Sequence, residues 1–201
     1  MKILGVITAR KNSRRLKNKN KKILGGKPLI QYTFDLVKKI NFLCDVILTT
    51  DDKDILNLGK KNKIICPWLR PAFLAQDNTS SYQTVMHAYN WYKKNYFDVD
   101  AIFLFQPTSP FRKVDSVNSA FKIFKKNIEL RSVVSVSFCK KNLMFFPNGT
   151  IFINPVKELK KYKSFLTDRT IPIFNNDMIE TIDINYFSDW KIAERKLKRI
   201  N

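Results

Sequence analysis

A basic, polar loop follows directly on the first apolar run of the chain. The run Ile3 to Thr8 leads into Ala9-Arg10-Lys11-Asn12-Ser13-Arg14-Arg15-Leu16-Lys17-Asn18-Lys19-Asn20. Backbone amides and fixed cations in one loop can spread over the oxygens of a triphosphate, whose transfer chemistry depends mainly on charge stabilisation and alignment. The loop lacks the Gly-x-x-x-x-Gly-Lys-Ser/Thr and Gly-x-Gly-x-x-Gly spacings, which excludes P-loop and Rossmann sites. Taken alone, it could equally be a solvated surface turn.

Five further segments carry polar side chains at positions that follow or flank apolar runs. They are Thr50-Asp51-Asp52, Arg70-Pro71-Ala72-Phe73-Leu74-Ala75-Gln76-Asp77, Gln106-Pro107-Thr108-Ser109-Pro110-Phe111-Arg112, Asn148-Gly149-Thr150-Ile151-Phe152-Ile153 and Ile182-Asp183-Ile184-Asn185. Their order and content resemble the acylneuraminate cytidylyltransferases. This family comprises the CMP-sialic acid synthetases, with CMP-legionaminate, CMP-pseudaminate and, more distantly, CMP-Kdo synthetases. The resemblance extends over nearly the whole chain.

The resemblance implies a reaction and its requirements. In such enzymes the anomeric hydroxyl of an acidic nine-carbon sugar attacks the α-phosphate of CTP, assisted by Mg²⁺, and pyrophosphate leaves. It also implies a role in cell-surface polysaccharide biosynthesis. CTP and an acidic sugar of the sialic or legionaminic type are therefore the expected partners, and Mg²⁺ is the expected cofactor.

The resemblance assigns the basic loop to the phosphates. Arg10, Ser13 and Lys19 match positions that hold the triphosphate in the family, and Asn20 matches a position that touches the nucleotide. Arg14 stands where the family has a lysine, which keeps the charge but replaces a point charge by a planar fork. The expected catalytic cations are thus Arg10, Arg14 and Lys19. For Lys19 the alternative is a solvated loop lysine.

Two other groups of residues match the base and sugar positions of the family. Arg70 and the backbone near Thr79 match the cytosine-reading region, and Ser81 lies near the expected ribose site. Gln106 and Asn148 match positions that face the sugar, where a hydroxyl-rich acid needs amide donors and acceptors. Arg70 could instead only brace its loop, and Asn148 could only form a turn at the start of a strand.

The metal is expected at Asp183, which matches the family's metal carboxylate and counts with the catalytic residues; the alternative is a helix-capping aspartate. Mg²⁺ prefers oxygen ligands and bridges protein to phosphate. The family's second metal aspartate is Asn185 here, which offers an oxygen without negative charge. A reduced metal affinity is therefore expected.

The chain also departs from the family in length. Only the short segment Phe138 to Pro147 separates the Ser-Val-Val-Ser-Val run from Asn148, where relatives usually insert a dimer arm that reaches the partner's sugar pocket. Whether this chain forms a homodimer, and which sugar acid it takes, is therefore left open.

The elements that must position these loops alternate along the chain. Apolar runs predict strands at 3–8, 46–50, 63–66, 101–105, 133–137 and 150–153. Amphipathic patterns predict helices at 29–40, after Pro28 at a first helical position, at 82–94, after the capping pair Ser80-Ser81, and at 115–126. This alternation predicts an α/β fold with a mostly parallel, doubly wound sheet, in which ligands bind beyond the carboxyl ends of the strands.

Composition bounds the remaining choices. The 201 residues fit one domain, 1–201, and no apolar run approaches a membrane span. The first apolar run is too short for a secretory segment, so a cytoplasmic protein without membrane attachment is expected. The net charge of +20 could indicate a polyanion partner. Because most of the excess is Lys in scattered pairs, a nucleic-acid surface is the less favoured interpretation.

Two further functions remain alongside the sugar-acid cytidylyltransferase. One keeps CTP but changes the acceptor to Kdo or to a smaller acid. The other is a weakened relative that binds nucleotide or polyanion without turnover, which Arg14, Asn185 and the basic charge would accommodate.

Overall fold

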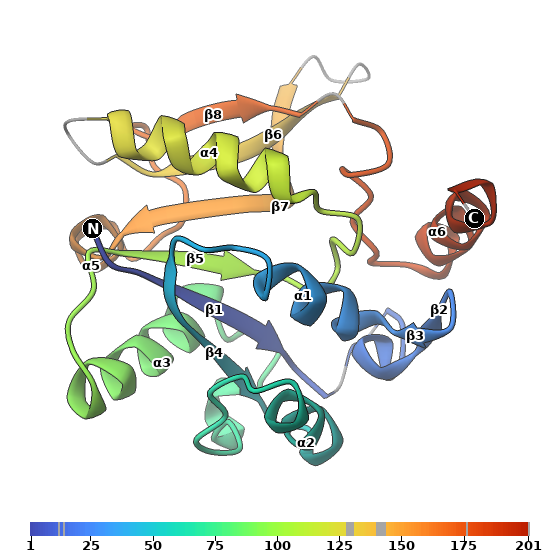
Figure 1. The fold of residues 1–201 in the computed structure, drawn as a ribbon, viewed down its shortest axis with the longest axis horizontal. Helices are drawn as coiled ribbons and strands as arrows, with labels where there is room; N and C mark the ends of the chain where they lie inside the picture. The colour runs from blue at the N-terminus through green and yellow to red at the C-terminus, as the bar shows by residue number, and fades with distance from the viewer. Residues whose placement is uncertain (12, 14, 128–130, 140–143, 176, 201) are drawn as a thin grey trace.

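The computed structural model describes residues 1–11, 13, 15–127, 131–139, 144–175 and 177–200. Its central element is a six-stranded sheet (Figure 1), formed by β1 (Ile3–Ala9), β4 (Leu43–Thr50), β5 (Ala101–Phe105), β6 (Val133–Cys139), β7 (Met144–Pro155) and β8 (Ile171–Phe174). The helices are α1 (Leu29–Val37), α2 (Lys53–Lys61), α3 (Ser81–Asn95), α4 (Val114–Lys126), α5 (Val156–Tyr162) and α6 (Phe187–Ile200). Short 3-10 turns, η1 (Lys19–Lys21) and η2 (Ala72–Leu74), and the two-residue strands β2 (Ile23–Leu24) and β3 (Lys27–Pro28) complete it.

The sheet has the order β4-β1-β5-β7-β6-β8 and is mostly parallel. β1 pairs in parallel with β4 and β5, and β6 pairs in parallel with β8, whereas β7 runs antiparallel to both of its neighbours. The chain passes from β1 to β4 on one side and later returns to place β5 on the other side. A doubly wound sheet forms its ligand crevice at such a reversal.

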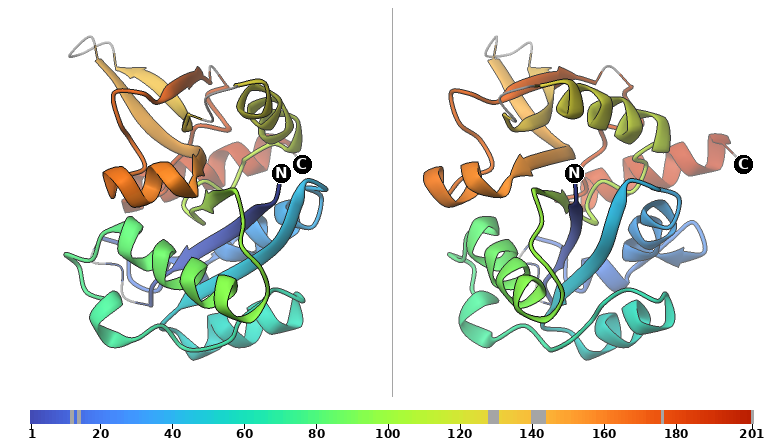
Figure 2. Two further views of the ribbon diagram at one scale, coloured as in Figure 1. Left: turned by 90° about the vertical axis from the view of Figure 1, so that its left-hand side faces the viewer. Right: turned by 60° about the vertical axis from the view of Figure 1, so that its left-hand side comes forward.

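Helices cover both faces of the sheet (Figures 1 and 2). On one face, α1, α2 and α4 pack on a core that includes Ile7, Phe34, Phe103 and Phe124. On the other face, α3 and α5 pack on a second core around Tyr89. Burial on both sides explains why the strands read as continuous apolar runs. The expected α/β class with a mostly parallel sheet is confirmed.

Two local expectations were wrong. Residues 63–66 do not form a strand of the sheet: only Ile65 bridges to Ile47, because Lys63 has a φ of +61° and Pro67, which has no N–H, follows the run. Pro28 is the N-cap residue of α1 and not its first helical residue, since its ψ of 143° is extended. Of the expected capping pair, Ser80 is the N-cap of α3 and forms a capping box with Gln83, whereas Ser81 is the first residue of the helix.

β6 and β7 form an antiparallel pair with a bulge at Asn148-Gly149. Val134 lies opposite Phe152 but Val136 lies opposite Pro147, so β7 carries extra residues against Ser135. Gly149 has a φ of +80°, and a Cβ there would lie 2.8 Å from the Ser109 hydroxyl. The bulge therefore requires glycine, and it brings β7 against the Gln106–Arg112 segment.

Within the described ranges, no helix combines the length and the apolar character needed to cross a bilayer.

Candidate active site

A polar cavity of about 370 Å³ opens at the carboxyl edge of the parallel strands. It gathers residues from the basic loop, from η2 and the start of α3, from the segment after β5 and from the segment before α6. Ten of the residues expected in a site line it: Arg10, Ser13, Lys19, Asn20, Arg70, Thr79, Ser81, Gln106, Asp183 and Asn185. Residues that are far apart in the sequence therefore line one cavity.

Strand ends and backbone hydrogen bonds bring the segments together. The basic loop and Gln106 follow directly on the paired strands β1 and β5. The Arg70 amide donates to the Thr50 carbonyl at the end of β4, at 2.7 Å. The Ile184 amide donates to the Thr108 carbonyl at 2.8 Å, which places the Asp183 segment beside the segment after β5.

The basic loop presents cations that are already held by the protein. Arg10 forms an ion pair with Asp77 at 2.6 Å. Asn20 is buried and donates its amide to the Arg10 carbonyl at 3.1 Å, which ties the two ends of the loop together. Anionic phosphates entering the cavity would compete with Asp77 for the Arg10 guanidinium.

Lys19 is buried, and this decides against a solvated loop lysine. Only 8% of it is exposed, and its Nζ donates to the Ile184 carbonyl at 2.7 Å and approaches the Asn185 Oδ1 at 3.5 Å. Burial lowers the pKa of the ammonium to about 8, although Asp183 counteracts this effect. A desolvated ammonium interacts strongly with a phosphate that enters the same cavity.

Arg70 is buried at the end of β4. Its Nε donates to the Thr49 hydroxyl at 3.0 Å and its Nη2 to the Thr49 carbonyl at 2.6 Å, and burial lowers its pKa to about 10. The guanidinium thus braces the loop, and Arg70 is also one of the residues that line the cavity. Its bracing role does not exclude contact with a base.

Asp183 and Asn185 lie side by side in the cavity. The Asn185 Nδ2 donates to the Asp183 Oδ2 at 2.6 Å, whereas the buried Asp183 Oδ1 has no hydrogen-bond partner among the described residues. Among the described residues, no backbone amide of α6 donates to Asp183, and Asp189, in the first turn of α6, accepts the amides of Asn185 and Tyr186. Within the described ranges, no three His, Cys, Asp or Glu side chains cluster as a metal cage. One carboxylate oxygen beside an amide oxygen still fits Mg²⁺, which takes few protein ligands and completes its shell with phosphates and water.

Two expected residues are not part of the described cavity. Asn148 is 3% exposed: its Oδ1 accepts from the Ser135 hydroxyl at 2.5 Å and from the Thr150 amide at 3.1 Å, and its Nδ2 donates to Ser137 at 3.0 Å. Its amide therefore holds the β7 bulge, and its sugar contact stays a prediction. Arg14 lies outside the described residues.

Several lining residues had no role in the sequence analysis. Thr8, Arg15, Asp77, Thr84 and Thr108 also line the cavity. Each lies in or next to a segment named above, near the end of a strand or the start of a helix. That position in the sequence is the signal by which these residues could have been found. Their orientation into the cavity depends on the fold.

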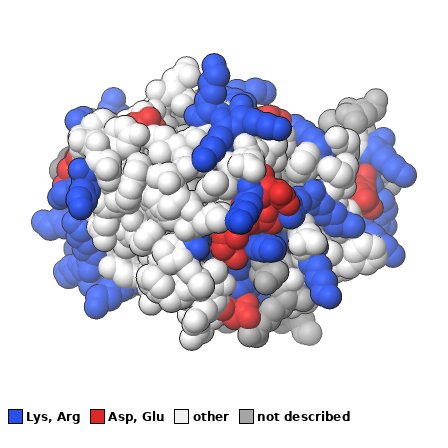
Figure 3. All heavy atoms as spheres, turned by 90° about the horizontal axis from the view of Figure 1, so that it is seen from below, with Lys and Arg blue, Asp and Glu red and all other residues white. Residues whose placement is uncertain are grey.

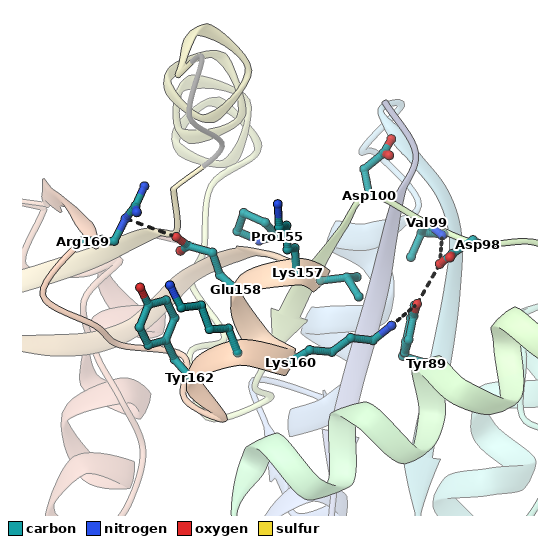
Figure 4. Close-up of a pocket in the computed structure, with 12 residues that line it drawn as sticks. Tyr89, Asp98, Val99, Asp100, Pro155, Lys157, Glu158, Lys160, Tyr162 and Arg169 are labelled. Carbon is teal, nitrogen blue, oxygen red and sulfur yellow. Dashed lines mark hydrogen bonds and ion pairs between the residues drawn. The ribbon is translucent and has the colours of Figure 1, made fainter.

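A larger cavity, of about 660 Å³, lies where β5 begins and β7 ends (Figure 4). Its polar groups bind each other: Lys160 donates to the Tyr89 hydroxyl at 3.3 Å, Tyr89 donates to Asp98 at 2.7 Å, and Arg169 pairs with Glu158 at 3.6 Å (Figure 4). Of the expected site residues that the structure describes, none lines it. Its size therefore does not make it the better candidate for the active site.

The fold is similar to that of two solved structures. The CMP:2-keto-3-deoxy-manno-octonic acid synthetase complexed with CTP superimposes with a TM-score of 0.73 at 13% identity, covering 100% of both chains. A cytidylyltransferase from Leptospira borgpetersenii also has a TM-score of 0.73, at 17% identity, covering 99% of this chain and 87% of its own. At these identities the likeness concerns the fold.

Sequence comparison identifies the family. The cytidylyltransferase family model matches residues 4–190, and the chain belongs to this family of CTP-dependent nucleotidyltransferases. The CMP-N,N'-diacetyllegionaminic acid synthase of Legionella pneumophila is 32% identical, over 100% of this chain and 98% of the relative. The N-acylneuraminate cytidylyltransferase of Escherichia coli is 29% identical over 96% of this chain, which spans only 51% of that relative. The expected family membership is confirmed.

Proposed function

We propose that this enzyme transfers CMP from CTP to the anomeric hydroxyl of an acidic nine-carbon sugar of the sialic, legionaminic or pseudaminic type. The hydroxyl oxygen forms a bond to the α-phosphorus, the bond from that phosphorus to the oxygen bridging to the β-phosphate breaks, and pyrophosphate leaves. The hydroxyl proton passes to solvent. The observation that carries this proposal is the gathering of ten expected residues from separate segments in one polar cavity.

Each group of residues has a role in the proposal. Arg10, Ser13 and Lys19 hold the triphosphate, with Arg14 as a further cation and Asn20 against the nucleotide. The basic side chains stabilise charge that develops on the phosphates, and Lys19 does so from a buried position.

The base and the acceptor bind on either side of the phosphates. Arg70 and Thr79 face cytosine, Ser81 faces the ribose, and Gln106 and Asn148 face the sugar acid. Support comes from cavity positions for all of these except Asn148. Because the Asn148 amide is used within the protein, a second acceptor class, such as Kdo or a smaller acid, remains a candidate.

We propose Asp183 and Asn185 as the protein ligands of Mg²⁺, which when bound neutralises phosphate charge and orients the leaving group. Asp183 carries the negative charge of this pair. Asn185 holds the Asp183 carboxylate by its hydrogen bond, and its oxygen lies near Lys19.

The test is pyrophosphate release from CTP with Mg²⁺ across a panel of sialic, legionaminic, pseudaminic and Kdo acids. We expect turnover with at least one nine-carbon acid and tighter binding of CTP than of UTP, measured by calorimetry. Turnover with Kdo alone would select the second acceptor class. Equal affinities for CTP and UTP would contradict the cytosine site.

We also propose a cytoplasmic location, because CTP is a cytoplasmic metabolite. Sedimentation measures whether the protein forms a homodimer. Titration with nucleic acid at several salt concentrations measures whether it binds nucleic acid weakly and in a salt-sensitive way.

A further inference from the structure

Arg112 is a buried arginine that belongs to the segment after β5 but does not line the active-site cavity. Only 5% of it is exposed, and its guanidinium lies 5.4 Å from the centre of the Phe105 ring. Burial lowers its pKa to about 10, whereas the carboxylates of Glu180 and Asp183 oppose this effect. A charged group is costly to bury, so its contacts require a functional or structural reason.

The guanidinium joins two segments at their backbones. Its Nη2 donates to the Gln106 carbonyl at 3.0 Å and to the Gly149 carbonyl at 3.4 Å. Gln106 is one of the residues that line the cavity, and Gly149 forms the β7 bulge next to Asn148. The two residues expected to face the sugar acid therefore lie on segments held by one side chain.

The surroundings of Arg112 hold the same segments from other sides. The Ser109 hydroxyl lies 2.8 Å from the position that a Gly149 Cβ would occupy. Glu180 accepts from the Lys113 amide at 2.9 Å and from the Ser116 hydroxyl at 2.7 Å. Among the described residues, no hydrogen bond of Arg112 reaches the basic loop or the Arg70 segment, which are expected to bind CTP.

We propose that Arg112 is a positioning residue that sets the affinity for the sugar acid by clamping the Gln106 segment against the Gly149 bulge. This inference rests on the proposed function. Arg112 acts through Gln106 and does not touch either substrate. Loss of the clamp lets Gln106 move relative to β7, which weakens the sugar site while the CTP site keeps its own supports.

The test compares the unaltered enzyme with Arg112→Met, which removes the charge, and Arg112→Lys, which keeps the charge but can reach fewer carbonyls. The acceptor is N,N'-diacetyllegionaminic acid. We expect the KM for the sugar to rise at least tenfold in Arg112→Met and less in Arg112→Lys, with the KM for CTP changed by less than threefold. Arg169→Met, which removes an arginine that lines the larger cavity instead, should leave both KM values unchanged.

Two further readouts keep the inference testable. Guanidinium added to Arg112→Ala should lower its KM for the sugar, and amide hydrogen exchange should rise in residues 106–112 and 147–150 but not in residues 15–20.

If Arg112→Met does not fold, Arg112→Lys carries the same comparisons. Equal rises in both KM values, or no change in either, would overturn the clamp. Absence of pyrophosphate release by the unaltered enzyme with every acid would contradict the proposed function, whereas unchanged exchange in residues 106–112 would contradict the clamp itself.

Discussion

At the residue scale, the site depends on a few charged side chains whose contacts are already made before any ligand binds. Arg10 is paired with Asp77, Lys19 is held by the Ile184 carbonyl, and Asp183 is bonded to Asn185. Preorganised charges of this kind need little rearrangement when charge develops in a reaction. Their removal should therefore affect turnover more than stability.

We expect Arg10→Ala and Lys19→Ala each to lower turnover by at least about tenfold, because each removes a fixed cation from the phosphate region. Steady-state pyrophosphate release measures this effect. Lys17→Ala is the matched control, since Lys17 is an exposed lysine of the same loop that does not line the cavity. A rate in either cavity variant equal to that of Lys17→Ala would assign that residue to a solvated loop.

Asn185→Asp should lower the Mg²⁺ concentration needed for half-maximal activity. A second carboxylate adds a Coulomb attraction for the ion that a neutral amide lacks. Without metal, the same substitution places two like charges together, so we also expect a lower melting temperature that Mg²⁺ restores. Asp183→Ala serves as the inactive control. Retained activity in Asp183→Ala, with no change in Asn185→Asp, would move the metal away from this segment.

At the element scale, the β7 bulge decides how the sheet meets the segment after β5. It needs a positive φ at Gly149 and leaves no room for a side chain beside Ser109. Asn148 and Ser135 satisfy the polar groups that the bulge would otherwise leave buried without partners. A short insertion in one strand thus fixes the position of an active-site loop.

Gly149→Ala should destabilise the protein by about 1–3 kcal/mol through backbone strain, with an added contribution from the clash with the Ser109 hydroxyl. Gly26→Ala is the matched control, because Gly26 also has a positive φ, of +86°, but no atom of the described residues lies within 4 Å of the position of a Cβ there. Urea unfolding gives both free energies.

Ser109→Ala combined with Gly149→Ala should recover part of the lost free energy of unfolding, since the double substitution removes the clashing hydroxyl. Equal losses of unfolding free energy in Gly149→Ala and Gly26→Ala would mean that the backbone conformation alone causes the destabilisation.

At the scale of the whole molecule, charge is abundant but dispersed. The chain carries a net charge of +20, and on the face seen from below Lys and Arg lie in several separate groups, with acidic side chains among them (Figure 3). Two carboxylates outside the helices and strands form ion pairs at helix ends: Asp98 with Lys93 of α3, and Asp177 with Lys113, which precedes α4. These pairs oppose the repulsion that a large net charge creates.

The stability of the fold should fall as the pH drops from about 4 to 2. The hydrogen bond from Lys93 lowers the pKa of Asp98 to about 2, and the one from Lys113 does the same for Asp177. A carboxylate whose pKa is lowered by folding contributes stability above its unfolded pKa, and this contribution is lost as the pH falls through the folded pKa.

Melting temperatures at several pH values test this effect. Asp98→Asn should lower the melting temperature near neutral pH, and the difference from the unaltered protein should shrink strongly as the pH falls to 2. Asp168→Asn, which removes an exposed carboxylate without an ion pair among the described residues, should have little effect at any pH. A difference between Asp98→Asn and the unaltered protein that is as large at pH 2 as at neutral pH would contradict this explanation.

The sequence by itself determined the alternation of strands and helices, the α/β class and the segments that carry chemistry. Apolar runs and capping residues act locally, so Ser80 caps α3 as the pattern predicted. Family membership followed from the order of the motifs. The extent of a single domain over 1–201 stays a prediction.

Only the tertiary structure decided which of the expected residues meet. The strand predicted at 63–66 failed because its pairing with β4 depends on backbone angles and on Pro67. The Asn148 amide is bonded inside the protein, and Arg112 reaches Gln106 and Gly149 together, because β7 runs antiparallel beside β5. Such contacts join residues far apart in the chain, and no local pattern encodes their distance.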